Sequence, residues 1–348
     1  MNKIVSAKKS ILFLINPKSG VQNKVGLPKL IESVLDKRKY EYAIAETEYR
    51  GHATELAEDA VKQHIDVVVA VGGDGTVNEV GRALVGSKTA LGILPFGSGN
   101  GLARHLGIPI NPRSAIEFIN KAQPVSVDYG KINDFPFFCT CGIGFDAFVS
   151  HSFSKGKRRG LFGYMNNTLM DFIKYESEVY EVETEWNRKK HKAFLIACGN
   201  AAQYGNNAYI APKASMRDGM LSVTILEPFM VVDIPMILGQ LFSRNLCQNN
   251  RIKTIDTRWI KIKRRERGVV HFDGEPVVMD ANLFIEIVPS GLNVLASPDW
   301  DGSGANISIF QQGVDLLRGT LPEVDIQELK ERLPKLTVKN IKKIGKQD

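Results

Sequence analysis

Cysteine, tryptophan and long apolar runs are scarce in this sequence. Its 348 residues include four cysteines and three tryptophans. Four cysteines are too few for the disulfide framework of a small secreted domain, so we expect isolated thiols in a reduced, cytoplasmic setting. The most apolar stretch, Phe229 to Leu238, is broken by Asp233 and Pro235. It is shorter than the ~18 uncharged residues of a membrane-spanning helix, so the sequence predicts no such helix.

The composition is that of an ordinary globular protein. Hydrophobic residues make up 43% and charged residues 24% of the chain, which excludes a mainly disordered, collagenous or coiled-coil protein. A length of 348 residues favours two domains, since one domain usually has about 100 to 200 residues. The formal net charge of +7 suits anionic partners such as nucleotides, nucleic acid or an anionic membrane, without choosing among them.

The first part of the chain alternates strand and helix patterns. Residues 27–35, 53–61 and 77–85 have apolar side chains at helical spacing. Short apolar runs before, between and after these patterns predict strands buried on both faces. This rhythm predicts an α/β domain of the Rossmann-like kind, with a parallel sheet between two layers of helices. The runs are Ile11–Ile15, Val67–Val71 and Leu91–Leu94.

After about residue 125, apolar and polar residues alternate instead. Alternation at 180–186, 221–225, 259–263 and 283–288 predicts strands joined by turns, and hence an antiparallel, all-β sandwich-like second domain. We expect one helix within it, from about 164 to 175, and another in the tail. The predicted boundaries are 1–127 for the α/β domain, 128–300 for the β-sandwich and 301–348 for the partly helical tail.

A glycine-rich loop follows the run Val67–Val71 and opens the next helix. Glycines allow backbone N–H groups to turn toward phosphate oxygens, and the start of a helix adds its positive dipole end. The loop lies in the crevice where open α/β sheets bind ligands. Its acid, Asp74, can hold Mg²⁺ or accept a proton. The loop consists of Gly72, Gly73, Asp74, Gly75 and Thr76.

Two further loops follow other strands of the same predicted sheet. Loops after different parallel strands meet at one edge, so together they predict one phosphate site. The sequence has no GxxxxGK[ST], which excludes a P-loop mechanism. One loop contains Gly97, Ser98, Gly99, Asn100 and Gly101, and the other contains Asn16, Pro17, Lys18, Ser19 and Gly20.

The stretch Gly142 to Ala147 formally matches a dinucleotide-binding fingerprint. It lies in the strand-rich half, and no helix with a ribose-binding acid clearly follows it. We therefore interpret it as a tight turn near the domain junction.

Four motifs occur in order along the chain: NPKSG at 16–20, GGDGT at 72–76, GSGN at 97–100 and DGE at 273–275. The combination resembles the diacylglycerol kinase and sphingosine kinase superfamily of lipid kinases. The GGDGT loop alone is also similar to that of NAD kinases. The resemblance implies a NAD-kinase-like α/β domain that binds ATP, a β-sandwich domain that binds the lipid, and a site in the cleft between them.

The resemblance also implies roles for individual residues of the nucleotide site. Asn16 and Ser19 match positions that contact ATP, and Thr47 and His52 match a T-x4-H element beside the nucleotide. Asp74 matches the essential acid of the phosphate loop. The other loop positions implied to bind ATP are Gly20, Gly72, Gly73, Gly75, Thr76, Gly97, Ser98, Gly99 and Asn100.

Further acids match positions that act on the acceptor or the metal. Asp128 matches an acid that faces the polar head of the acceptor lipid. Asp273 and Glu275 belong to a motif associated with metal binding and proton transfer, and Asp218 is similar to a residue that binds structural Mg²⁺. The resemblance thus implies ATP and Mg²⁺ as cofactors, with Asp74, Glu275 and Asp218 as metal ligands. Whether Asp74 or Glu275 takes the proton of the acceptor hydroxyl stays open.

One position departs from the family pattern. Bacterial diacylglycerol kinases usually have an aspartate where this sequence has Gly101, and the loop here is more similar to that of sphingosine kinases. The acceptor therefore stays open between diacylglycerol, a sphingoid base and a similar lipid alcohol.

Two basic clusters favour contact with an anionic membrane leaflet, where each basic residue contributes roughly 1 kcal/mol. No nucleic-acid recognition module accompanies them, so we expect no nucleic-acid partner. We expect a cytoplasmic lipid kinase, peripheral to the inner face of the membrane. Two alternative functions are those of an NAD-kinase-like enzyme and of a non-catalytic nucleotide- and membrane-binding homologue. A homodimer formed through the tail also stays open. The clusters are Arg258, Lys261, Lys263, Arg264, Arg265 and Arg267, and Lys155, Lys157, Arg158 and Arg159.

Overall fold

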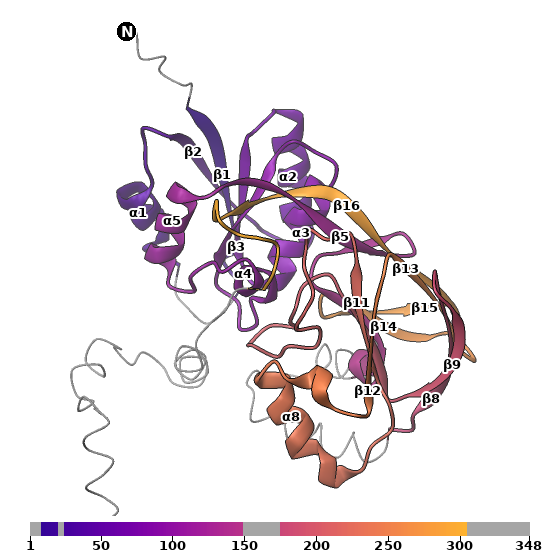
Figure 1. The fold of residues 1–348 in the computed structure, drawn as a ribbon. Helices are drawn as coiled ribbons and strands as arrows, with labels where there is room; N and C mark the ends of the chain where they lie inside the picture. Colours follow the sequence, from indigo (N-terminus) through magenta and orange to yellow (C-terminus); the bar gives the residue numbers. More distant parts are fainter. Residues whose placement is uncertain (1–7, 20–23, 149–174, 305–348) are drawn as a thin grey trace, which may run out of the picture.

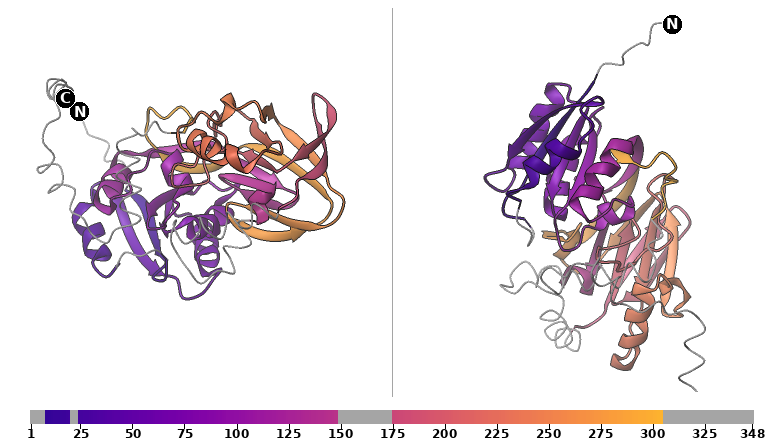
Figure 2. Two further views of the ribbon diagram at one scale, coloured as in Figure 1. Left: turned by 90° about the horizontal axis from the view of Figure 1, so that it is seen from below. Right: turned by 90° about the vertical axis from the view of Figure 1, so that its left-hand side faces the viewer.

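The protein consists of two lobes that lie end to end in a computed structural model (Figure 1). The structure describes residues 8–19, 24–148 and 175–304. The first lobe is α/β, and the second is built mostly of strands. The two further views in Figure 2 show the same division.

The first lobe contains four parallel strands in the order β2-β1-β3-β4. β3 is buried along its whole length, as its run of β-branched residues predicts. The strand order reverses between β1 and β3, so the loops after these two strands flank the crevice of a topological switch point. The strands are β1 (Lys9–Ile15), β2 (Tyr40–Glu46), β3 (Val67–Gly72) and β4 (Ala90–Pro95).

Helices cover both faces of this parallel sheet, as predicted. α1 and α5 lie together on one face, and α2 and α3 lie together on the other (Figure 1). Local sequence sets the helix starts: Pro112 begins α5, and the side chain of Asn111 caps it by accepting the N–H of Ser114. The helices are α1 (Leu27–Val34), α2 (His52–Lys62), α3 (Asp74–Leu84), α4 (Gly101–His105) and α5 (Pro112–Lys121).

The second lobe is an antiparallel sandwich, which confirms the predicted fold class. One sheet has the order β12-β11-β10-β7-β14-β15. Its strands are β7 (Thr140–Gly144), β10 (Leu195–Gly199), β11 (Leu221–Leu226), β12 (Ile252–Thr257), β14 (Gly268–Phe272) and β15 (Glu275–Met279). The facing strands are β5 (Gln123–Ile132), β6 (Phe135–Phe137), β8 (Glu178–Thr184), β9 (Arg188–Ala193), β13 (Trp259–Lys263) and β16 (Asn282–Ala296).

Two long strands, β5 and β16, run through both lobes. The second half of β16 pairs in parallel with β4, and its first half pairs with β13 of the sandwich. β5 pairs with β16 along both halves, with a bulge between Val288 and Leu292. The parallel sheet therefore continues without a break into one layer of the sandwich. The sequence predicts only residues 283–288 of β16 as a strand.

Short helices cover the outer face of the β12–β15 sheet, where a third apolar cluster forms. They are η1 (Val231–Asp233), α8 (Ile234–Phe242) and η2 (Leu246–Gln248). The helix expected at 164–175 lies almost wholly outside the described residues, and the tail helix lies outside them entirely.

All four cysteines are free thiols, and Cys139, Cys141 and Cys198 are buried. This agrees with the expectation of isolated thiols. Within the described part of the chain, every helix is too short or too polar to cross a bilayer.

Candidate active site

Asp74 joins the first glycine loop to the second. Its Oδ1 accepts the N–H of Gly101 at 2.7 Å, and its Oδ2 accepts the N–H of Asn100 at 2.9 Å. Burial raises the pKa of the Asp74 carboxyl, while these N–H groups act in the opposite direction. The predicted essential acid thus sets the relative position of the two glycine loops.

The two loops also touch through their backbones. A Cβ atom added to Gly97 would lie 2.6 Å from Cα of Gly73, and one added to Gly99 would lie 2.7 Å from Oδ2 of Asp74. Asn100 has a positive φ of 50°, and its side chain closes the loop onto both backbone polar groups of Gly97. These glycines are therefore required by close approach, besides any contact with phosphate.

The loop after β1 meets the same edge. Nδ2 of Asn16 donates to Oγ1 of Thr76 at 3.1 Å. Nζ of Lys24 donates to the carbonyl of Asn16 at 2.6 Å and to Oγ of Ser19 at 2.8 Å, and burial lowers the pKa of this lysine. The sequence analysis missed Lys24, which stands outside the recognised motifs.

Other predicted loop residues take different positions at this edge. Gly75 and Ser98 are exposed. A Cβ atom on Gly72 would collide with Thr76 at 2.4 Å from its Oγ1, so Gly72 is fixed by packing. Gly20 lies outside the described residues.

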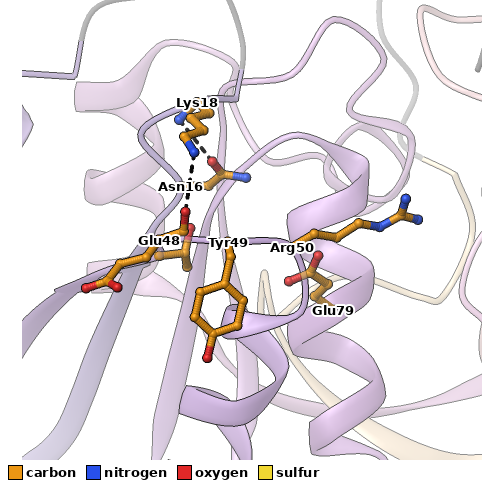
Figure 3. A pocket seen from close by; sticks show the side chains of 7 residues that line it. Asn16, Lys18, Glu48, Tyr49, Arg50 and Glu79 are labelled. Atoms are coloured by element: carbon orange, nitrogen blue, oxygen red, sulfur yellow. Dashed lines mark hydrogen bonds between the residues drawn. The ribbon is translucent and has the colours of Figure 1, made fainter.

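A pocket opens beside these loops, between the ends of β1 and β2 (Figure 3). Thr47 lines it, and His52 lies behind it, where its Nδ1 accepts the N–H of Glu48 at 3.1 Å. The ring of His52 stacks on that of Tyr49 with centroids 4.6 Å apart. His52 thus orders the pocket wall. The lining residues are Asn16, Lys18, Thr47, Glu48, Tyr49, Arg50 and Glu79.

Asp273 fixes the β14–β15 turn against the entrance of β7. Its carboxylate accepts the N–H groups of Phe138 and Cys139, each at 2.7 Å, and of Thr140 at 3.0 Å. Burial raises the pKa of Asp273 to about 6, although the three N–H groups oppose the shift. Its observed contacts are therefore those of a residue that holds the turn.

Glu275 reaches across to the first lobe. Its two oxygens pair with Arg82 of α3 and with Arg50, each at 3.1 Å. The guanidinium of Arg82 also lies over the ring of Phe272, 5.2 Å from its centroid. The sequence analysis placed Glu275 at the cleft but missed both arginines, whose partner is about 200 residues away in the chain.

Asp128 has a different set of contacts from the one that the resemblance implies. It is only 3% exposed, and its oxygens accept the N–H groups of Gly219 and Ser290, each at 2.8 Å. It therefore holds the β16 bulge and the loop before β11. A contact between Asp128 and the acceptor stays a prediction.

Asp218 lies close to two other acids. Burial raises its pKa, and the negative charges of Asp128 and Asp256 add to the effect. Its Oδ1 accepts the N–H of Met220. In the described ranges no group of three histidine, cysteine or acidic side chains is placed to hold a metal ion, so Mg²⁺ at Asp218 stays a prediction.

The structure explains the departure at Gly101. A Cβ atom there would lie 3.1 Å from the carbonyl oxygen of Tyr204, in a loop of the second lobe. The same loop donates the N–H of Asn206 to the carbonyl of Gly99 at 3.1 Å. This loop occupies the space into which a larger residue at position 101 would project.

Tyr204 also takes part in a polar cluster that the sequence analysis missed. Its hydroxyl donates to Oδ2 of Asp146 at 2.7 Å, and Nε2 of the buried His271 lies 2.8 Å from the same oxygen. Asp146 belongs to the stretch 142–147, which we interpreted as a turn. The sequence feature that could have indicated this cluster is the presence of an acid inside that glycine-rich stretch.

Comparisons with known proteins place this architecture in a family. Residues 10–132 match the diacylglycerol kinase catalytic domain, and residues 139–296 match the YegS C-terminal NAD kinase beta sandwich-like domain. A probable lipid kinase YegS-like from Chromohalobacter salexigens is 30% identical over 284 residues, 78% of this chain and 90% of that protein. A probable lipid kinase YegS-like from Pectobacterium atrosepticum is 29% identical over 300 residues, 82% and 96% of the two chains.

A solved structure agrees at the level of the fold. A putative diacylglycerol kinase from Bacillus anthracis superposes with a TM-score of 0.68 at 23% identity, covering 84% of this chain and 98% of that one.

The chain belongs to the YegS-like lipid kinases of the diacylglycerol kinase family. The predicted superfamily, fold class and enzyme class, a kinase, are therefore confirmed.

Proposed function

We propose that this protein transfers the γ-phosphoryl group of ATP to a hydroxyl group of a membrane lipid. The observation that carries the proposal is the joining of two glycine loops by Asp74 at the edge that faces the second lobe. Phosphoryl transfer depends mainly on positioning and on neutralising charge, and such loops supply both.

The first lobe supplies the nucleotide site. Exposed backbone at Gly75 and Ser98 and the amino-terminal end of α3 face the side where phosphates would bind. Lys18 in the adjoining pocket can meet a phosphate oxygen, although Glu48 and Glu79 line the same pocket and Arg50 pairs with Glu275. The exposed ring of Tyr49 offers a stacking surface for a base. These features support ATP as the donor.

Mg²⁺ fits this site as an ion that arrives with the nucleotide. Magnesium sites in kinases usually use one or two carboxylates and the substrate phosphates. Asp74 would be one protein ligand, because carboxylate oxygens can accept further partners besides one N–H group each. When bound, the ion would neutralise charge on the transferred phosphoryl group.

The second lobe supplies groups for the acceptor. Among the described residues, Tyr204 and His271 both contact the same carboxylate oxygen of Asp146, so its other oxygen can receive a hydroxyl or ammonium group of a lipid head. The backbone of Tyr204 touches the second glycine loop, which brings this cluster close to the phosphate site. The proton acceptor stays open between Asp74 and Glu275, since Glu275 must leave its arginines to act.

The test is ATP consumption with diacylglycerol, sphingoid bases, ceramide or NAD in mixed micelles, with and without Mg²⁺. We expect a phosphorylated lipid from the wild type and a loss of about 10²-fold or more in Asp74→Asn, because the amide places an NH₂ group against a backbone N–H. Thermal melting checks that the variant is folded. Undiminished turnover in Asp74→Asn, or turnover of NAD alone, would contradict the proposal.

A further inference from the structure

Large apolar side chains are exposed along one short segment of the second lobe. We call residues 229–242, which include η1 and α8, the apolar segment. Six of the thirteen exposed large hydrophobic residues in the described chain belong to it, with Val232 74% and Met230 61% exposed. A cluster of this kind on a protein surface marks a contact site. The six are Met230, Val231, Val232, Met236, Leu238 and Phe242.

The apolar segment is anchored from its inner side. Ile237 and Leu241 pack into the apolar cluster on the outer face of the β12–β15 sheet. Phe229 packs edge-on against Phe194, with ring centroids 5.0 Å apart. The exposed side chains of the apolar segment therefore project from elements that are anchored to the sheet, and α8 lies at the far end of the lobe (Figures 1 and 2).

The single charged residue of the apolar segment is neutralised. Asp233 accepts the N–H of Met230 at 3.0 Å and pairs with Arg251 at 3.5 Å. Transfer of the segment into an apolar medium would therefore carry no isolated charge with it.

Positive charge borders the apolar segment. The stretches 188–193 and 227–253 contain seven lysines and arginines and two acids. Arg251 directly precedes β12 and pairs with Asp233 of the segment. Lys253 and Arg188 pair with Glu227 and Glu181, while Lys189, Lys190 and Lys192 are exposed on β9. Burial lowers the pKa of the His191 imidazole, and the nearby positive charge of Lys253 lowers it further. An apolar patch with a basic border matches the acyl chains and headgroups of an anionic bilayer.

Five of the six residues in the basic cluster expected at 258–267 are exposed, so membrane contact through them stays a prediction, whereas the sixth has another role. Arg264 is buried, and its guanidinium donates to the carbonyls of Gly268, Val269 and Met279. It therefore holds the β13–β14 turn, and its assignment to a membrane surface is wrong. The other cluster, at 155–159, lies outside the described residues.

Aromatic rings connect the apolar segment with the polar cluster of Asp146, Tyr204 and His271. Phe194, which contacts Phe229, also contacts Phe145 with centroids 4.5 Å apart. Phe145 precedes Asp146 in the chain. An apolar layer thus extends from the exposed segment to the acid proposed to bind the lipid head.

We propose that the apolar segment docks on an anionic lipid bilayer and that the acceptor lipid passes from the bilayer along this layer to Asp146. The docking requires no catalysis, whereas the passage of the acceptor rests on the proposed function. The proposed partner is the bilayer, not a second copy of the chain.

The experiment is co-sedimentation of the full chain with vesicles of phosphatidylcholine, with or without phosphatidylglycerol. We expect the wild type to bind the vesicles that contain phosphatidylglycerol. Val232→Gln/Met236→Gln should bind them about tenfold or more weakly, because two apolar side chains no longer enter the bilayer. The matched control is Val278→Gln, a 50% exposed valine on β15 at the opposite edge of the sheet from β12, which should bind like the wild type.

Two further measurements separate docking from chemistry. Turnover of a short-chain, water-soluble acceptor should be equal in the double variant and the wild type, while turnover of vesicle lipid falls in the variant. Vesicle binding without any lipid turnover would remove the proposed function and keep the docking. Equal vesicle binding by the double variant and the wild type overturns the docking. The docking is also overturned if light scattering shows that the wild type is a dimer and the double variant is a monomer, because the segment would then bind a second copy of the chain.

Discussion

At the scale of single residues, the site depends on where two glycine loops can touch. The Cα atoms of Gly73 and Gly97 lie so close that a side chain at position 97 has no room. Asp74 then joins the loops through backbone N–H groups. The same few residues thus set the position of the two loops and the position of the Asp74 carboxylate, so few substitutions are tolerated there.

We expect Gly97→Ala to lower the free energy of unfolding by about 1–3 kcal/mol, because the new methyl group forces the loops apart. The matched control is Gly75→Ala, where an added Cβ meets nothing within 4 Å. Alanine is also the better helix former at that position in α3. Denaturant unfolding of the two variants measures the difference, and a Gly97→Ala protein as stable as the control would show that the loops tolerate separation.

The glycine loops and their acids were predictable, whereas the partners of the acids were not. Loop composition and its place after buried strands identified Gly72–Thr76 and Gly97–Gly101. Asp128 and Asp273, however, bind backbone N–H groups of distant segments, and every residue except proline carries such a group. A sequence therefore shows that a carboxylate is present but gives no sign of what it will accept.

At the scale of elements, the β14–β15 hairpin joins the sandwich to α3. Glu275 pairs with one partly buried arginine, Arg82, and one that is 83% exposed, Arg50. Water and salt screen the exposed pair far more than the other. The two arginines thus allow the contributions of a partly buried and an exposed ion pair to stability to be compared on one carboxylate.

We expect Arg82→Ala to lower the free energy of unfolding by about 1–3 kcal/mol, since it removes a charged hydrogen bond and the contact with Phe272. Arg50→Ala should change it by about 0–1 kcal/mol. Thermal or denaturant unfolding at moderate salt measures both. Equal losses in the two variants would mean that burial does not distinguish these pairs.

Among the elements, those with a uniform pattern were the predictable ones. β3 is buried on both faces and reads as a continuous apolar run. β16 was recognised only in its first half, because a bulge at 288–292 interrupts the alternation. Its second half pairs with β4 in the first lobe instead of with the sandwich. The polar cluster of Asp146, Tyr204 and His271 was missed for a related reason, since Asp146 lies in a stretch that local sequence describes equally well as a turn.

At the scale of the whole molecule, two strands make one sheet out of two lobes. Residues 123–132 pair with residues 285–296 along both halves of the contact. Loss of this pairing would break the parallel sheet and the sandwich together. The lobes should therefore behave as one cooperative unit.

We expect the two lobes to unfold in a single transition. Trp186 and Trp259 lie in the sandwich, whereas Trp300 packs against the core of the first lobe. Tryptophan fluorescence of a Trp300→Phe variant therefore follows the second lobe. Helical circular dichroism mainly follows the first, which holds α1, α2, α3 and α5. Coincident denaturation curves are the expected outcome, and two midpoints separated beyond error would show independent lobes.

The paired strands between the lobes bear on how such an enzyme can move. Hinge closure in many kinases uses a few loop residues that absorb backbone rotation. Here the crossing is a hydrogen-bonded ribbon, and its one irregularity, the bulge at Ser290, is held by the carboxylate of Asp128. A ribbon of this kind twists more readily than it bends. Donor and acceptor would then meet at a nearly constant separation, and the exclusion of water from the transferring phosphoryl group would fall to the two substrates themselves.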